Sequence, residues 1–240
     1  MIGARRLWYA ALQPVVQGLF VTVFGVRVYH RERLPRSGGV LVVSNHQSYL
    51  DPVLAAVGMP RPFHPMARES LFRFAPLRWL IRSFYAFPVK RGRADLGAVR
   101  EALRRLKSGA VVLVFPEGTR TRDGSIGPLQ GGPATIAARA GVPILPLVID
   151  GAFEAWPRRR RLPRPGRVRV ACGRPVSAQE VAGRAPEDVM ADVREEMLRL
   201  QAELRQCGMR SAECGVNGKK AREAPSCRAR RAARSGGRPQ

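Results

Sequence analysis

The sequence predicts a mixed α/β fold in which helices flank a largely parallel sheet. Short apolar runs, rich in β-branched residues, recur along the chain and have the length and composition of buried strands. Segments with apolar residues at helical spacing lie between these runs. Because parallel strands need a crossover connection, usually a helix, this alternation favours a layered α/β fold. The expected strands are residues 40–43, 62–67, 85–89, 111–115, 144–149 and 168–171.

The segments between these strands are expected to be helices. The clearest is 94–107, whose leucines and valine share one face, and Gly109 is expected to end it. Asp51 and Pro52 form a good helix start, with Asp as N-cap and Pro at the first helical position. The expected helices are residues 52–58, 69–84 with a break near Pro76, 94–107, 131–140 and 186–205.

Composition is consistent with one large domain carrying extensions. The chain has 240 residues, and the 45% that are hydrophobic suffice for a substantial core. A net charge of +24, from 42 Lys and Arg against 18 Asp and Glu, favours phosphate-rich partners such as anionic lipid, a phosphorylated substrate or nucleic acid. The four cysteines form no Cys-x-x-Cys pair, so we expect neither a zinc site nor a disulfide framework.

Three regions are expected along the chain: residues 1–30, 31–206 and 207–240. The first combines an apolar stretch, 7–26, with flanking arginines, but polar residues and a proline interrupt the stretch. This pattern favours a helical segment lying in the membrane interface over a spanning helix, with a buried N-terminal helix as the alternative. From Cys207 the sequence loses apolar periodicity and is rich in Arg, Ala, Gly and Ser, which predicts a disordered basic tail.

Polar residues directly follow two of the predicted strands. The strand 40–43 runs into the sequence SNHQSYLDP, and the strand 111–115 runs into PEGTR. Such loops at the carboxyl ends of neighbouring strands are expected to form one site. His46 precedes Asp51 by five residues, and a carboxylate that holds one imidazole nitrogen as N–H leaves the other free to accept a proton. The alternatives are an ordinary loop histidine and a helix-capping aspartate.

Four charged residues are candidates for substrate binding. Arg120 is a candidate phosphate ligand, because guanidinium binds phosphate with two parallel hydrogen bonds and stays charged; the alternative is a salt bridge to a nearby acid. Glu117 either orients a substrate hydroxyl, holds Arg120 or caps the strand end. Arg68 and Arg91 are further phosphate candidates, each against the alternative of a solvated surface charge.

The two motifs together resemble those of the glycerolipid acyltransferases, the family of the 1-acyl-sn-glycerol-3-phosphate (lysophosphatidic acid) acyltransferases. That family's first motif is Asn-His followed by four residues and Asp, and its third is Phe-Pro-Glu-Gly-Thr-Arg. Both occur here in the same order, and the resemblance covers about residues 35–175. It implies a glycerol-3-phosphate acyltransferase-like fold and an enzyme associated with the cytoplasmic face of a membrane.

The resemblance also implies an activity. An acyl chain would move from acyl-CoA or acyl-carrier protein to the free hydroxyl of 1-acylglycerol-3-phosphate, giving phosphatidic acid, with no metal and no cofactor besides that co-substrate. It makes His46 and Asp51 the catalytic pair. The residues that it assigns to the acceptor's phosphate are Glu117, Gly118, Thr119, Arg120, Arg91 in FPVKRG, and Arg68, where the family often has Lys.

Two other functions stay open. Leu129-Gln130 stands where many family members have Phe-Lys, and the missing cation favours another lysophospholipid or an amino-acid lipid as acceptor. The remaining alternative, from a different class, is a non-catalytic basic protein that binds nucleic acid or anionic membrane. The sequence carries no helix-turn-helix, RRM or zinc signature, so no nucleic-acid partner is expected.

Overall fold

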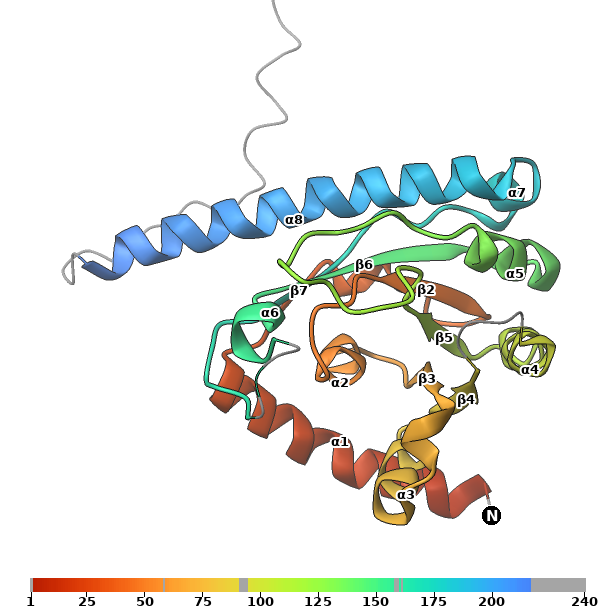
Figure 1. Ribbon diagram of the computed structural model, residues 1–240, viewed down its shortest axis with the longest axis horizontal. Coiled ribbons are helices and arrows are strands. Elements are labelled where there is room, and N and C mark those ends of the chain that lie inside the picture. The colour runs from red at the N-terminus through yellow and green to blue at the C-terminus, as the bar shows by residue number, and fades with distance from the viewer. Residues whose placement is uncertain (1, 58, 91–94, 158–159, 161, 217–240) are drawn as a thin grey trace, which may run out of the picture. The chain divides into compact units, whose positions relative to one another are not determined.

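The computed structural model of the chain describes residues 2–57, 59–90, 95–157, 160 and 162–216. A seven-stranded sheet lies at its centre, with strand order β1-β7-β6-β2-β5-β3-β4 (Figure 1). Every pairing of these strands is parallel except that of β6 with β7. The predicted mixed, largely parallel α/β fold is therefore confirmed. The strands are β1 Arg27–Tyr29, β2 Val40–Ser44, β3 Phe63–Arg68, β4 Phe87–Val89, β5 Val111–Val114, β6 Ile144–Asp150 and β7 Arg169–Cys172.

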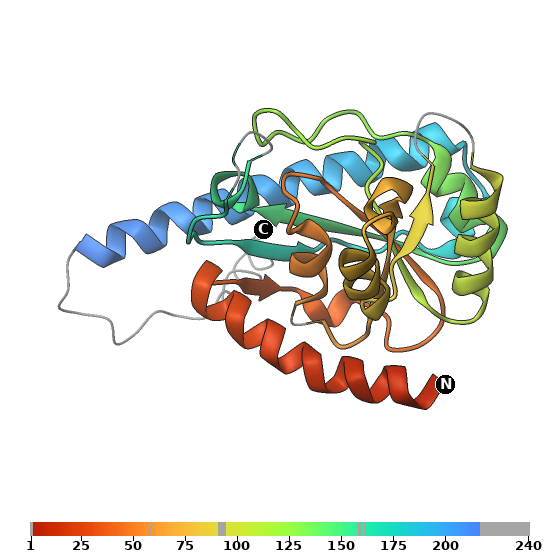
Figure 2. The same cartoon turned by 60° about the horizontal axis from the view of Figure 1, so that its bottom comes forward.

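Helices connect the strands and cover both faces of the sheet (Figure 2). The predicted helices are present with shifted ends, and the expected helix at 69–84 is divided into a 3-10 turn and α3. The short α6 and α7 were not expected. The helices are α1 Ile2–Phe24, α2 Asp51–Ala56, α3 Ala75–Ser83, α4 Leu96–Lys107, α5 Gly132–Ala140, α6 Ala152–Ala155, α7 Ala178–Ala182 and α8 Pro186–Val216, with 3-10 turns η1 Arg31–Arg33 and η2 Glu69–Phe72.

Strand β2 lies at the centre of the sheet, and all five of its residues are buried. Its side chains alternate between two hydrophobic cores, as the two-residue period of a strand requires. Leu41 and Val43 pack in the core under α4, α5 and α8, whereas Val40 and Val42 pack in the core under α1, α2 and α6. Gly39 precedes the strand, where a Cβ atom would overlap the carbonyl oxygen of Leu106 at the end of α4.

The N-terminal boundary expected after residue 30 is corrected by the structure. Residues Arg27–Tyr29 form β1, which pairs in parallel with β7 and so belongs to the sheet. Helix α1 is unbroken across Pro14. Phe24 is buried in the core, whereas Val15 and Leu19 are exposed, so α1 has one buried face and one exposed face. Within the described residues, no helix is both long and apolar enough to cross a membrane.

The C-terminal boundary is also corrected. Residues 1–204 and 205–240 form two separate units. Helix α8 continues to Val216, so the first ten residues of the expected tail, 207–216, lie in this helix. The rest of the predicted tail, 217–240, lies outside the described residues.

Candidate active site

His46 and Asp51 are in direct contact at the carboxyl end of β2. The Nδ1 atom of His46 lies 2.7 Å from Oδ2 of Asp51, whose side chain is fully buried. Because an ionised carboxylate can only accept, Nδ1 carries the proton and Nε2 is the nitrogen with a free lone pair. The His46 ring also stacks on Phe115, with centroids 4.3 Å apart, which limits its rotation. The pair therefore has the geometry of an oriented general base.

The loop between His46 and Asp51 holds the carboxylate in place. Oδ2 of Asp51 also accepts hydrogen bonds from the backbone N–H groups of Gln47, at 2.6 Å, and Ser48, at 2.7 Å. Leu50, rather than Asp51, occupies the N-cap position of α2, so the alternative of a helix-capping aspartate is wrong. The Ser48 hydroxyl accepts from the N–H of Leu50, at 3.3 Å, as a residue that stabilises the loop would.

Buried amide side chains on either side of His46 connect this loop to β6 and its neighbours. Asn45 donates to the carbonyl of Ile149 and accepts from its N–H, both at 2.8 Å. Gln47 donates to the carbonyl of Gly124, at 3.0 Å, and accepts from the N–H of Phe153, at 3.3 Å. These bonds replace the sheet ladder beyond the end of β2, so the backbone at His46 is rigid.

The second motif forms hydrogen bonds with both backbone groups of His46. Glu117 Oε1 accepts from the N–H of His46, at 3.2 Å, and the N–H of Thr121 donates to the carbonyl of His46, at 2.8 Å. Between them Gly118 has a φ of 69°, a left-handed conformation that suits glycine and allows the loop to turn back. Among the described residues, no ion pair joins Glu117 to Arg120, whose guanidinium lies over the ring of Tyr49.

Burial raises the pKa of Glu117 to about 7. The backbone N–H groups of His46 and Gly127 oppose this shift, and the nearby charge of Asp51 adds to it. A carboxylate with a raised pKa stabilises the fold at low pH, and this contribution is lost as the pH rises through the folded pKa.

The raised pKa of Glu117 leads to a prediction about stability. Glu117→Gln keeps the acceptor for the His46 N–H but cannot ionise. The unfolding free energy of the wild type, measured relative to that of the variant by urea denaturation, should fall as the pH rises from about 4.5 to about 7 and then level off. A difference that does not change with pH would show that the Glu117 carboxyl titrates normally.

Arg120 lies over the ring of Tyr49, with Cζ 3.4 Å from the ring centroid. Its Nη1 atom is buried and has no hydrogen-bond partner among the described residues. The Tyr49 ring in turn lies 5.4 Å from that of Trp156. The guanidinium is thus held by an aromatic face while donors remain available for an anion. The alternative of a salt bridge for Arg120 finds no acidic partner in the described part of the chain.

The other predicted phosphate ligands are less enclosed. Gly118 and Thr119 are exposed in the loop, and Arg68 is exposed at the end of β3, the strand beside β5. All three therefore lie at the same edge of the sheet as Arg120. Arg91 lies outside the described residues.

An apolar cavity of about 560 Å³ opens beside the site. Tyr49, Leu50 and Val53 bring the first motif and α2 into its wall, and Trp156, whose ring lies beside that of Tyr49, also lines it. Sequence analysis missed this cavity and the roles of Tyr49, Phe115 and Trp156. The aromatic residues inside or next to both motifs were the available signal, but only the fold shows which way they face.

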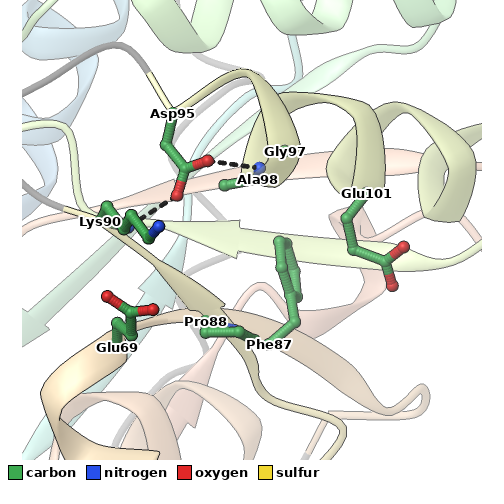
Figure 3. Close-up of a pocket in the computed structure, with 8 residues that line it drawn as sticks. All are labelled: Glu69, Phe87, Pro88, Lys90, Asp95, Gly97, Ala98 and Glu101. Carbon is green, nitrogen blue, oxygen red and sulfur yellow. Dashed lines mark hydrogen bonds between the residues drawn. The ribbon is translucent and has the colours of Figure 1, made fainter.

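A smaller cavity of about 230 Å³ lies between the end of β4, η2 and the start of α4 (Figure 3). Lys90, Glu69 and Asp95 face it. Asp95 accepts from the N–H groups of Lys90, at 2.8 Å, and Ala98, at 3.1 Å, and so caps α4. The Asp95 carboxylate is therefore occupied by hydrogen bonds to the backbone of the protein. Within the described residues, no group of three His, Cys, Asp or Glu side chains could hold a metal ion.

Comparison with known proteins identifies the family. The model of the family described as Acyltransferase matches residues 25–150, which include both motif loops. The chain belongs to the Acyltransferase family. This acyltransferase is 30% identical to the 1-acyl-sn-glycerol-3-phosphate acyltransferase of Bacillus subtilis, over 66% of its own chain and 77% of that protein. It is also 32% identical to the 1-acyl-sn-glycerol-3-phosphate acyltransferase alpha of Mus musculus, over 80% of its chain and 70% of the mouse protein.

A solved structure supports the same assignment. The crystal structure of the 1-acyl-sn-glycerophosphate (LPA) acyltransferase PlsC from Thermotoga maritima aligns with a TM-score of 0.73 and 30% identity, over 85% of this chain and 82% of that one. The predicted family resemblance and the prediction of an acyltransferase enzyme are therefore confirmed. The roles of individual site residues stay predictions.

Proposed function

We propose that this acyltransferase moves a fatty acyl chain from acyl-CoA or acyl-carrier protein to the free hydroxyl of 1-acylglycerol-3-phosphate, giving phosphatidic acid. The observation that carries the proposal is the His46–Asp51 pair, which leaves Nε2 of His46 free and whose loop also supplies Tyr49 and Leu50 to the wall of the apolar cavity. The names of the Bacillus and mouse relatives support this acceptor.

The proposed chemistry needs no covalent intermediate on the enzyme, because a thioester is already activated. As the acceptor oxygen bonds to the thioester carbonyl carbon, its proton moves to Nε2 of His46. The C–S bond then breaks, and the departing thiolate takes that proton back. Asp51 stabilises the imidazolium that forms in between, as in other pairs of this kind.

The two binding regions suit the two ends of a lysolipid. The cavity beside Leu50 and Val53 is lined almost entirely by apolar side chains, and each methylene buried there contributes about 0.8 kcal/mol. Arg120 supplies a permanently charged donor for the phosphate, and Tyr49 stands between the cavity and the guanidinium. A lysolipid that carries both an acyl chain and a phosphate matches this arrangement.

Arg120→Lys should mainly raise the KM for the acceptor, by about tenfold, because an ammonium group cannot reproduce the planar guanidinium fork. The KM for the donor and kcat should change much less. Arg122→Lys is a matched control, since Arg122 is exposed two residues further along the same loop. Initial rates with each substrate varied in turn measure the effect. A selective rise in the donor KM would instead assign Arg120 to the phosphates of the carrier.

A panel of acceptors tests the proposed function. Purified full-length protein is given labelled acyl-CoA or acyl-carrier protein with lysophosphatidic acid, with lysophospholipids whose phosphate carries a headgroup, and with amino-acid lipids. We expect the highest kcat/KM for lysophosphatidic acid. Preference for a headgroup-bearing lipid would change the acceptor. No product with any acceptor, together with salt-sensitive DNA binding, would favour the non-catalytic alternative.

One observation favours the second acceptor class. The amide Nε2 of Gln130 lies close to Gly118, where a Cβ atom would be 3.4 Å from it. The loop that surrounds the phosphate site therefore carries a neutral donor at this point. A neutral donor is compatible with a phosphate diester, which carries less charge than a phosphate monoester.

Association with the cytoplasmic face of a membrane is also part of the proposal. A lysolipid resides in a bilayer, and acyl donors are cytoplasmic. The exposed side of α1, with Val15, Leu19 and Val21, supports shallow insertion in the interface.

A further inference from the structure

The segment formed by η2 and α3 exposes a cluster of large apolar side chains. Phe74 and Trp79 expose 66% and 61% of their surface, and Leu71 exposes 38%. Isolated exposed apolar residues are normal on a soluble protein, but several in one short segment indicate an interaction surface. We call the large apolar and the basic residues that this segment exposes the α3 surface: Leu71, Arg73, Phe74, Arg78, Trp79 and Arg82.

The α3 surface is also cationic. Its three arginines are exposed, and Glu69 is the only acidic residue between positions 69 and 84 of the sequence. Arg82 reaches over the ring of Phe72, with Cζ 6.0 Å from the centroid, so its charge lies close to the apolar cluster. Aromatic side chains interspersed with arginines are typical of surfaces that bind the headgroup region of an anionic bilayer.

This surface borders the apolar cavity of the active site. Leu71, Ile81 and Phe84 form one part of the cavity wall, and Val16 and Gln17 of α1 form another. Helices α1 and α3 contact each other and lie side by side in both views (Figures 1 and 2). The cavity is thus lined by the same two helices that expose apolar residues.

We propose that the α3 surface docks on an anionic lipid bilayer. Phe74 and Trp79 insert at the level of the headgroups, and the arginines lie among the lipid phosphates. Docking places the cavity wall at Leu71 against the bilayer, so that an acyl chain passes from lipid to cavity without crossing water. The consequence for catalysis rests on the proposed function, whereas docking itself requires no turnover.

A second copy of the chain is a less suitable occupant. In a two-fold symmetric dimer, the same surface patch of each copy would face the other. Each α3 surface carries three arginines on a chain of net charge +24, so two such surfaces repel each other. An anionic bilayer supplies the opposite charge together with an apolar interior.

Sedimentation with sucrose-loaded vesicles tests the proposal on the full chain. The vesicles are phosphatidylcholine alone or an equal mixture with phosphatidylglycerol. Phe74→Ser/Trp79→Ser should lower the partition coefficient on the anionic vesicles about tenfold or more. Arg78→Gln should lower it about fivefold, on the anionic vesicles only. Leu198→Ser is the control, because Leu198 is 37% exposed on α8, which packs on the opposite face of the sheet, and it should bind as the wild type does.

A second measurement keeps the test independent of variant folding. Phospholipids brominated on the acyl chain should quench tryptophan emission of the wild type, and Trp79→Phe, which keeps an apolar aromatic side chain, should lose part of that quenching. Equal quenching in the two proteins, or wild-type partitioning of the double serine variant, would overturn the proposal. So would a wild-type dimer that the double variant loses while its vesicle binding stays unchanged.

Activity assays separate this inference from the proposed function. The double serine variant should lose activity on lysolipid embedded in anionic vesicles and keep it on a short-chain, water-soluble acceptor. Equal loss on both acceptors would show that the substitutions disturb the site itself and would overturn the proposed contribution of docking to catalysis. Absence of lysophosphatidic acid acylation in the wild type would instead contradict the proposed function and leave the vesicle results unaffected.

Discussion

His46→Ala should lower kcat by about 10²–10⁴-fold, because the proposed mechanism loses the group that accepts the proton of the attacking hydroxyl. Binding of both substrates should change little, so the loss should appear in kcat rather than in either KM. The fold should persist, since His46 keeps its backbone bonds to Glu117 and Thr121 whatever its side chain. Steady-state rates with acyl-CoA and lysophosphatidic acid, together with a thermal melt, measure both effects.

Ser48→Ala is the matched control from the same loop. Ser48 is buried, and its hydroxyl accepts a hydrogen bond from the N–H of Leu50, at 3.3 Å. Its removal should leave kcat within about threefold of the wild type, since a loop hydrogen bond contributes only about 1 kcal/mol. If Ser48→Ala were inactive while His46→Ala kept near wild-type turnover, a serine nucleophile would replace the general-base mechanism.

Asp51→Asn should be comparably severe, with a loss of about 10²–10⁴-fold in kcat. The Asp51 carboxylate holds the His46 Nδ1–H, and an asparagine amide presented to Nδ1 would favour the tautomer with the proton on Nε2, where the acceptor hydroxyl must deliver its own. The variant should also be less stable, because one buried oxygen accepts from the N–H groups of both Gln47 and Ser48.

The pH dependence distinguishes the two effects of Asp51→Asn. A lost orienting carboxylate should change the pH profile of kcat, whereas a simple loss of stability should lower the active fraction at every pH alike. Asp188→Asn is the matched control, since Asp188 is exposed in the first turn of α8. Asp51→Asn with normal kcat and an unchanged profile would show that Asp51 only supports the loop.

Local sequence patterns predicted two kinds of element: helices with a regular apolar face, and strands that are buried on both faces. Strands β2 and β5 are short runs dominated by valine, and the burial of every residue in both explains why composition alone located them. Strand β1 has only three residues, exposed or half-buried, and forms by pairing with β7, more than a hundred residues away. A pairing between strands so far apart in the chain leaves no local periodicity. The sequence therefore predicts residues 27–29 as part of the N-terminal helical segment.

The same distinction applies to the site. His46, Asp51 and Arg120 carry their chemistry in their residue types, and a spacing of five suffices to suggest the first pair. The role of Glu117 depends on which backbone N–H it meets, and the sheet decides this by bringing the ends of β2 and β5 together. Sequence reasoning therefore named the residue but not its contact.

What the amino-acid sequence determined by itself was the α/β alternation, the two polar loops and the choice of His46, Asp51 and Arg120 as candidate site residues, because strand composition, helix periodicity and side-chain chemistry are local properties. Only the tertiary structure decided that Tyr49 holds Arg120 and that an apolar cavity opens beside them. Cavities and cation–aromatic contacts arise between segments distant in the chain, and their geometry is set by how helices pack on the sheet.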